Sequence, residues 1–294
     1  MTQIARTIHT LTLRGQSCVL GARTWVMGVL NVTPDSFSDG GRFQAAGAAI
    51  EAGLAQFEAG ADVVDVGGES TRPGAQPVAA DEEIRRVVPV VEALRRRHHG
   101  FVSIDTTKAA VARAALDAGA DLVNDVSGFR FDPAMAALVA ERRVPAVVMH
   151  LRGDFAGMHR QPAYGDVARE VAHELAERLR DALRAGVERE QVLLDPGLGF
   201  AKDAGHTLEL LRRLSELRSL GRPLVVGPSR KSFIGRVLDL PAGERVFGTA
   251  AAVAASILAG AHVVRVHDVR PMAEVARVCD AILAAGPQAG RASA

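Results

Sequence analysis

The sequence predicts a (β/α)8 TIM barrel with an N-terminal β-hairpin and two long, mobile loops after barrel strands 1 and 2. The chain has 294 residues, a size at which such barrels occur as one domain. Eight short apolar runs recur along it, and each is followed by a stretch rich in Ala, Leu, Glu and Arg. A doubly wound parallel sheet is the alternative fold.

The apolar runs have the pattern of strands that are buried on both faces of a parallel sheet, because they are nearly continuous rather than alternating. We expect strands at 25–31, 61–68, 101–106, 121–128, 145–150, 191–197, 223–227 and 262–268. The alternating sequence at 7–24 predicts a hairpin ahead of the first of them.

The stretches between the runs carry helix signals. We expect helices that include 81–98, 107–119, 166–185, 204–219, 244–260 and 271–286. Pro271 lies near the start of the last one, and a glycine follows the predicted helix ends at Gly60, Gly119, Gly186 and Gly260. No linker interrupts the series, so we expect one domain over 1–286 and a small polar tail at 287–294.

Composition and charge limit the classes of function. Lys+Arg 35 against Asp+Glu 34 leaves a net charge of +1, so no overall field favours nucleic acid or an anionic membrane as a partner. The apolar segment at 246–266 is broken by polar residues and predicts a packed helix and strand rather than a membrane span.

Cys18 and Cys279 lie near opposite ends of the chain, and we interpret them as idle thiols in a reducing cytoplasm. The amino terminus lacks the apolar core of a secretion signal.

The rarest polar residue types lie at one end of the predicted barrel. The chain has only three lysines and two asparagines, all at or just beyond predicted strand ends: Lys108, Lys202, Lys231, Asn31 and Asn124. Active sites of these barrels lie at the carboxyl ends of the strands. Lysine and asparagine also favour loops, but that preference alone would place some of them at the opposite end. The same strand ends carry Asp105, Asp125, Asp195 and Asp268.

Arg265 and His267 predict an anion site at the end of the last strand. They are two residues apart, so on a strand they point to the same side. They also precede a predicted helix, whose first backbone amides favour an anion.

Two unusually long segments follow the first two strands. Residues 31–43 and 67–78 are rich in Gly, Pro, Ser and Asp, so they bend easily and have little core to bury. Thr71 and Arg72 offer a hydroxyl and a guanidinium to a phosphate, and Phe37 is an aromatic ring among polar residues. We expect both segments to close over the same barrel mouth.

Several common catalytic motifs are absent from the sequence. The segments at 195–202 and 227–233 fit neither the Walker nor the Rossmann spacing. His173 and Glu174 are followed by Glu177 where a zinc protease needs histidine, and no GxSxG elbow occurs. A zinc hydrolase and a serine nucleophile are therefore disfavoured.

Taken together, eight strings of the sequence resemble the dihydropteroate synthase family, which sulfonamide drugs inhibit. In order, they are MGVLNVTPDSFSDGG, GGESTRPGA, SIDTTK, NDVSG, VVMHLRG, DPGLGFAK, GPSRKSF and RVHDV, and the likeness spans about residues 10–285. It implies condensation of 6-hydroxymethyl-7,8-dihydropterin diphosphate with 4-aminobenzoate to give 7,8-dihydropteroate and pyrophosphate, with Mg²⁺ and as a homodimer. Leu151 stands where the family commonly has methionine, which exchanges one apolar side chain for another.

The resemblance also implies roles for the strand-end residues. Asp195 would accept two hydrogen bonds from the pterin, with Asn124, Asp105 and Lys231 on other ring edges and Met149 and Phe200 as apolar walls. Arg265, His267 and Asn31 would hold the diphosphate, Asn31 would also contact Mg²⁺, and Thr71 and Arg72 would arrive with the second loop. The aminobenzoate site would contain Phe37, Pro73, Phe200, Lys231 and Ser232, and Asp35 would balance charge near the reacting cation. The catalytic group implied is Asp105, Asp195, Lys231, Arg265 and Asp35.

Three other functions remain as alternatives. A methyltetrahydrofolate-dependent methyltransferase would share Asp105, Asn124 and Asp195 but has no use for a diphosphate pocket. A non-catalytic pterin-binding paralogue would keep the same binding residues. A phosphate-binding barrel for a sugar is the third, although the separate Asp and Asn side chains favour a flat nitrogen heterocycle.

Overall fold

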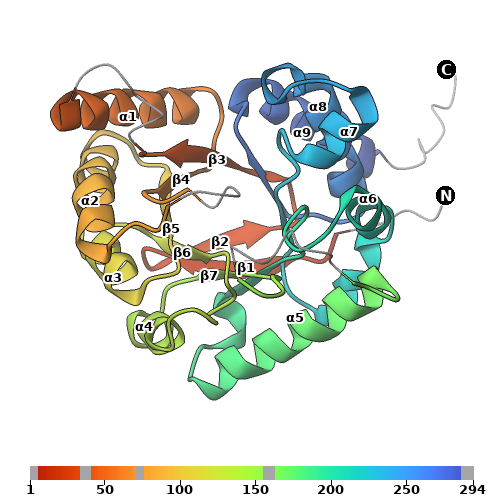
Figure 1. The fold of residues 1–294 in the computed structure, drawn as a ribbon, viewed down its shortest axis with the longest axis horizontal. Helices are drawn as coiled ribbons and strands as arrows, with labels where there is room; N and C mark the ends of the chain where they lie inside the picture. The colour runs from red at the N-terminus through yellow and green to blue at the C-terminus, as the bar shows by residue number, and fades with distance from the viewer. Residues whose placement is uncertain (1–5, 34–40, 71–75, 155–162, 286–294) are drawn as a thin grey trace, which may run out of the picture.

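The computed structural model describes residues 6–33, 41–70, 76–154 and 163–285, and its sheet confirms the predicted barrel (Figure 1). Eight parallel strands pair in the order β8-β7-β6-β5-β4-β3-β10-β9. A parallel bridge between Leu194 and Leu224 joins the two edges, so the sheet closes on itself. The strands are β3 (Trp25–Asn31), β4 (Val63–Gly67), β5 (Phe101–Asp105), β6 (Leu122–Asp125), β7 (Ala146–Met149), β8 (Val192–Asp195), β9 (Val225–Val226) and β10 (Val263–Val266).

Helices surround the strands on the outside (Figure 1). They are α1 (Gly41–Glu58), α2 (Ala80–Arg97), α3 (Ala109–Asp117), α4 (Ala134–Arg142), α5 (Val167–Arg184), α6 (Ala204–Arg212), α7 (Ser232–Leu238), α8 (Val246–Leu258) and α9 (Val269–Ala284). The four glycines predicted after helix ends all have positive φ, as that position requires. No helix of the described ranges is long and apolar enough to cross a membrane.

One predicted helix, at 204–219, differs from the structure. It is α-helical only to Arg212 and continues as a 3₁₀ helix, Leu214–Leu220. Between these two helices, the backbone of Arg213 departs from helical geometry. Its guanidinium donates to Asp166 at the start of α5 (2.8 Å). This tertiary contact overrides the local preference for a longer helix.

The interior of the barrel has an apolar floor. Val63, Leu122, Leu193 and Val263 on four strands pack there with Trp25 and their neighbours, and all are buried. The hairpin of β1 (His9–Leu13) and β2 (Gln16–Leu20) adds Leu11, Leu13 and Leu20 to the same cluster. These residues lie toward the amino ends of the strands, so the hairpin closes that end of the barrel.

Two residues further along several strands, the interior becomes polar. Because side chains alternate between the two faces of a strand, the positions that follow Val63, Leu122, Leu193 and Val263 on the inner face are Asp65, Asn124, Asp195 and Arg265. The barrel therefore holds an apolar floor beneath a layer of polar groups at its carboxyl end. A second core of buried side chains fills the space between the sheet and the helices.

Candidate active site

Arg265 occupies the centre of the polar layer. Its Nε donates to Asp65 Oδ2 (2.6 Å), and one terminal nitrogen donates to Asp105 Oδ2 (2.5 Å). Asn124 Nδ2 donates to the same Asp65 oxygen (2.8 Å). Residues from β4, β5, β6 and β10 are thus joined directly across the barrel mouth.

The charges of this cluster depend on one another. Burial raises the pKa of Asp105 to about 7, although the Arg265 guanidinium acts in the opposite direction. Burial also lowers the pKa of Arg265, but the carboxylates of Asp65 and Asp105 outweigh it and raise that pKa above its ordinary value. Arg265 therefore stays charged and pairs with two acidic side chains that are largely shielded from solvent.

Asp195 ends β8 beside this cluster. Its Oδ1 accepts a hydrogen bond from the Gly197 backbone amide (2.7 Å), which orients the carboxylate at the start of the following turn. Burial raises the pKa of Asp195, while the Lys231 ammonium opposes that rise. The side chain is 6% exposed, so a ligand that pairs with it is shielded from water.

Lys231 lies over the turn that follows Asp195. Its Nζ donates to Leu198 O and lies 4.4 Å from the centre of the Phe200 ring. Burial lowers the pKa of Lys231 to about 8. Met149 is buried in a small apolar cluster against which Phe200 packs, so an apolar surface borders the polar layer.

A second group of polar residues ties the segment after β9 to the end of β10. The Ser229 hydroxyl accepts from the His267 backbone amide (3.1 Å) and lies 3.0 Å from His267 Nδ1. Arg230 Nε donates to Asp268 (2.9 Å). These contacts place His267 at the same mouth of the barrel as Lys231, which follows Arg230 in the sequence.

Comparison with known proteins decides the family. Residues 27–267 match the family described as "Pterin binding enzyme". The dihydropteroate synthase of Synechocystis sp. is 49% identical over 89% of this chain and 91% of that protein, and the Escherichia coli K12 enzyme is 43% identical over 88% and 92%. The structure of Xanthomonas albilineans dihydropteroate synthase with 4-aminobenzoic acid is similar with a TM-score of 0.89 and 43% identity, covering 95% of this chain and all of that one.

This chain belongs to the dihydropteroate synthase family. Its activity is accordingly that of a transferase of folate biosynthesis, and the resemblance stated from the sequence is confirmed. The structure of the X. albilineans enzyme with 7,8-dihydropteroate is also similar, with a TM-score of 0.85, 40% identity and coverage of 94% and 100%.

The structure adds to the site a residue that was not predicted from the sequence. Asp65 is fully buried and contacts both Arg265 and Asn124. Its Oδ1 has no hydrogen-bond partner among the described residues. The signal in the sequence was a carboxylate inside the apolar strand VVDVG, where an unpaired charge is costly.

Other predicted residues lie at the mouth without contacting the Arg265 cluster. Asn31 is half-buried at the end of β3, where it pairs in register with Gly67 of β4. Ser232 is exposed at the start of α7. Asp35, Phe37, Thr71, Arg72 and Pro73 lie outside the described residues, as do the central parts of both predicted loops.

Lys108 and Asp125 also have partners outside the Arg265 cluster. Lys108 Nζ donates to Glu69 (2.7 Å) and Glu83 (2.6 Å), which lie near the second long segment. Asp125 accepts from the backbone amides of its own turn, including that of Ser127 (2.7 Å). Their position at a strand end was predicted from the sequence, but the direction of their side chains was not.

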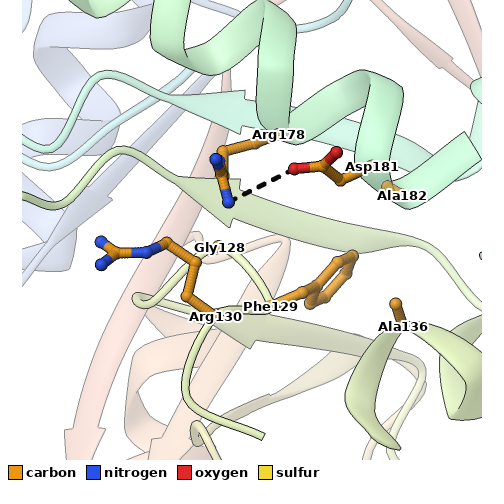
Figure 2. Close-up of a pocket in the computed structure, with 7 residues that line it drawn as sticks. All are labelled: Gly128, Phe129, Arg130, Ala136, Arg178, Asp181 and Ala182. Atoms are coloured by element: carbon orange, nitrogen blue, oxygen red, sulfur yellow. Dashed lines mark ion pairs between the residues drawn. The ribbon is translucent and has the colours of Figure 1, made fainter. Parts of the chain in front are cut away.

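A cavity outside the barrel mouth is distinct from this site (Figure 2). It has a volume of about 420 Å³ and lies near α4 and α5, where Arg178 pairs with Asp181 (3.3 Å). Its lining includes none of the residues assigned above to the pterin site. The cavity is lined by Gly128, Phe129, Arg130, Ala136, Arg178, Asp181 and Ala182.

Proposed function

We propose that this protein condenses 6-hydroxymethyl-7,8-dihydropterin diphosphate with 4-aminobenzoate, giving 7,8-dihydropteroate and pyrophosphate. The observation that carries the proposal is the polar layer inside the carboxyl end of the barrel, which contains Asn124 of β6, Asp195 of β8 and Arg265 of β10. An enzyme of the same family has been solved with 4-aminobenzoic acid, and another structure of it contains 7,8-dihydropteroate.

In this proposal the carboxylate of Asp195 recognises the pterin. A pterin presents a ring N–H beside an exocyclic amine, and one carboxylate accepts from both. Asn124 and Asp105 bind other ring edges, and Lys231 donates to ring acceptor atoms. Met149 and Phe200 supply the apolar walls against which a flat ring packs.

The diphosphate then lies toward Arg265, His267 and Asn31, with Thr71 and Arg72 contributing from the second loop. Mg²⁺ fits this arrangement because it keeps several waters and needs only one or two protein oxygens beside substrate phosphates. The Asn31 amide oxygen would be the protein ligand, and the described residues contain no cluster of three acidic, His or Cys side chains that would form a closed metal cage. When bound, the ion neutralises charge on the departing pyrophosphate.

The chemical step requires no protein nucleophile. The bond between the pterin methylene carbon and the diphosphate oxygen breaks, and the electron-rich dihydropterin stabilises the cation that remains. The neutral amine of 4-aminobenzoate forms the new C–N bond and then loses a proton. The acidic side chains of Asp105 and Asp195 favour positive charge on the ring system, and Asp35 acts near the same cation.

The second substrate occupies the outer part of the mouth. Among the residues that the structure describes, Phe200 and Lys231 form one side of this site. Ser232 lies next to Lys231 at the start of α7. Phe37 and Pro73 complete it from the two long loops. Residues 1–286 act as one pterin-binding domain in this account, and the free thiols of Cys18 and Cys279 support a cytoplasmic location.

Growth complementation tests the proposed function in a cell. A bacterium without its own dihydropteroate synthase, grown without folate-dependent end products, is expected to grow when it expresses this chain. The Asp195→Asn variant serves as the control and is expected to fail. Absence of growth with folded, well-expressed wild-type chain would contradict the proposed reaction.

We also propose that two copies of the chain form a homodimer through α7, α8 and α9. These helices lie side by side (Figure 1) and expose large apolar side chains, of which Phe247 is 85% exposed. Val237, Val278 and Ile282 are exposed on the same three helices. Exposed apolar surface of this kind is typical of interfaces between subunits.

The Phe247→Glu variant is expected to be a monomer, because a buried carboxylate at the centre of an apolar interface has no partner. Light scattering after gel filtration measures the mass. Val19→Glu is the matched control, since Val19 is an exposed apolar residue on the hairpin instead. A monomeric wild-type protein, or a Phe247→Glu variant that stays dimeric, would refute this interface.

A further inference from the structure

Lys202 is a buried lysine whose hydrogen bonds hold one turn of the active site. It is 4% exposed, and its Nζ lies 2.9 Å from His150 Nδ1. The same ammonium donates to Gly197 O (3.1 Å) and Phe200 O (3.0 Å). An ammonium has three hydrogens, so these three acceptors use all of them.

His150 connects Lys202 to helix α5. Its Nε2 lies 3.0 Å from Glu174 Oε2, and Arg152 Nε donates to the same carboxylate (2.9 Å to the other oxygen). Burial and the nearby Lys202 ammonium lower the pKa of His150 to about 4, while Glu174 acts in the opposite direction. We assign a neutral imidazole to His150, with its proton on Nε2, which donates to Glu174. The Nδ1 lone pair then accepts from the Lys202 ammonium, so each of these polar groups has a hydrogen-bond partner.

The turn held in this way, residues 196–201, supports several parts of the substrate site. Gly197 orients Asp195 through its amide, and Leu198 O accepts from Lys231. Phe200 packs in the apolar cluster with Met149.

The conformation of this turn is unfavourable without support. Gly197, Gly199 and Ala201 all have positive φ (65°, 75° and 48°), which an alanine adopts reluctantly. A Cβ at Gly197 would lie 2.1 Å from His150 O, so the turn passes close against the backbone just after β7. The contacts of Lys202 close the turn from beneath.

We propose that Lys202 is a positioning residue for the reaction: its ammonium, completed by His150 and Glu174, holds the 196–201 turn so that Asp195 and Phe200 face their substrates. This inference rests on the proposed function, because it assigns the turn to the pterin and aminobenzoate sites. Lys202 does not contact substrate in this account. It acts through the backbone carbonyls that it binds.

The protonation state of Lys202 then matters for catalysis. Burial lowers its pKa to about 7, and Lys231 and Arg152 act in the same direction, while Asp195 and Glu174 act in the opposite one. Tyr164, from the segment before α5, presents its ring at 6.0 Å from Nζ. As pH rises and the third proton leaves, the lone pairs of Nζ and His150 Nδ1 face each other and that contact is lost. Catalytic efficiency is therefore expected to fall on the alkaline side as Lys202 deprotonates.

Lys202→Met tests the proposal because methionine has a similar length and no ammonium. The substitution is expected to misplace the 196–201 turn and thereby to lower kcat/KM for 4-aminobenzoate by about 100-fold. Pterin affinity, measured by calorimetry, is expected to fall as well, because Asp195 loses its support. The alkaline limb assigned to Lys202 is expected to disappear from the pH profile.

Two further variants separate positioning from a general loss of folding. Glu174→Gln keeps an oxygen that accepts from His150, so its KM values are expected to stay near those of the wild type. His150→Leu removes the third acceptor of the ammonium and is expected to reproduce the Lys202→Met defect, even if Lys202→Met itself does not fold. A folded Lys202→Met with unchanged KM values, pterin affinity and pH profile would overturn the proposal.

Calorimetry measures pterin affinity directly, so the role of Lys202 is tested without the reaction assay. Failure of the wild-type chain to form dihydropteroate would contradict the proposed function. Wild-type pterin affinity in both folded Lys202→Met and folded His150→Leu would contradict the role of Lys202 alone.

Discussion

The Asp195→Asn variant is expected to lose nearly all pterin binding. Asparagine keeps the size of the side chain and an oxygen for the Gly197 amide, which donates to Asp195 at 2.7 Å. It replaces the second acceptor with a donor, so one of the two pterin N–H groups faces an N–H of the protein. Loss of one charge-assisted hydrogen bond in a buried site, together with the negative charge that strengthens the other, predicts roughly a 10²- to 10⁴-fold weaker affinity.

Isothermal calorimetry with a dihydropterin measures this loss. Asp181→Asn is the matched control, because Asp181 lies on α5 and pairs with Arg184 at the surface. The control is expected to bind like the wild type and both variants are expected to melt close to it. An Asp195→Asn variant with wild-type pterin affinity would place the pterin elsewhere.

The Arg265→Met variant is expected to be strongly destabilised. Arg265 is the charged partner of Asp65, which is fully buried, and of Asp105. Removing one member of a buried ion pair costs about 3–5 kcal/mol, because the remaining charges lose their compensation. Thermal unfolding is expected to show a fall in Tm of roughly 5–15 °C.

The pH dependence of this loss has a definite sign. Arg265 lowers the pKa of Asp105, so without Arg265 that pKa rises further, and the buried Asp105 side chain is neutral in acid and is forced to ionise as pH increases. Destabilisation is therefore expected to be small near pH 5 and to grow toward pH 8. Asp65→Asn combined with Arg265→Met is expected to recover part of the stability, since one uncompensated carboxylate is removed.

Substrate binding tests the role of Arg265 in a second way, with a different substitution. Arg265→Ala is expected to weaken the diphosphate-bearing pterin far more than the pterin without diphosphate, since only the former presents an anion to the guanidinium. Equal losses for the two ligands would remove Arg265 from the anion site and leave it with the structural role.

The strands were predictable from the sequence because each is an apolar run buried on both faces of a parallel sheet. Short helices were harder to predict from the sequence. Helix α7 contains Gly235, where a Cβ would lie 2.0 Å from the Arg245 guanidinium, so packing rather than helix propensity decides that position.

The position of the site was also predictable, whereas the partners of its side chains were not. Lysine and asparagine lie at strand ends as expected, but Lys108 binds two glutamates and Lys202 binds backbone carbonyls beneath the site. Asp65 was missed because a search at strand ends does not find a carboxylate in the middle of a strand. Contacts across a barrel depend on register, which local sequence does not contain.

The most direct test is release of pyrophosphate by the purified protein, measured with the pterin diphosphate, Mg²⁺ and 4-aminobenzoate and with each component omitted in turn. Release is expected only when all three are present, with 7,8-dihydropteroate appearing in equal amount. Tight pterin binding without turnover would contradict it and would identify the chain as a non-catalytic pterin-binding member of the family.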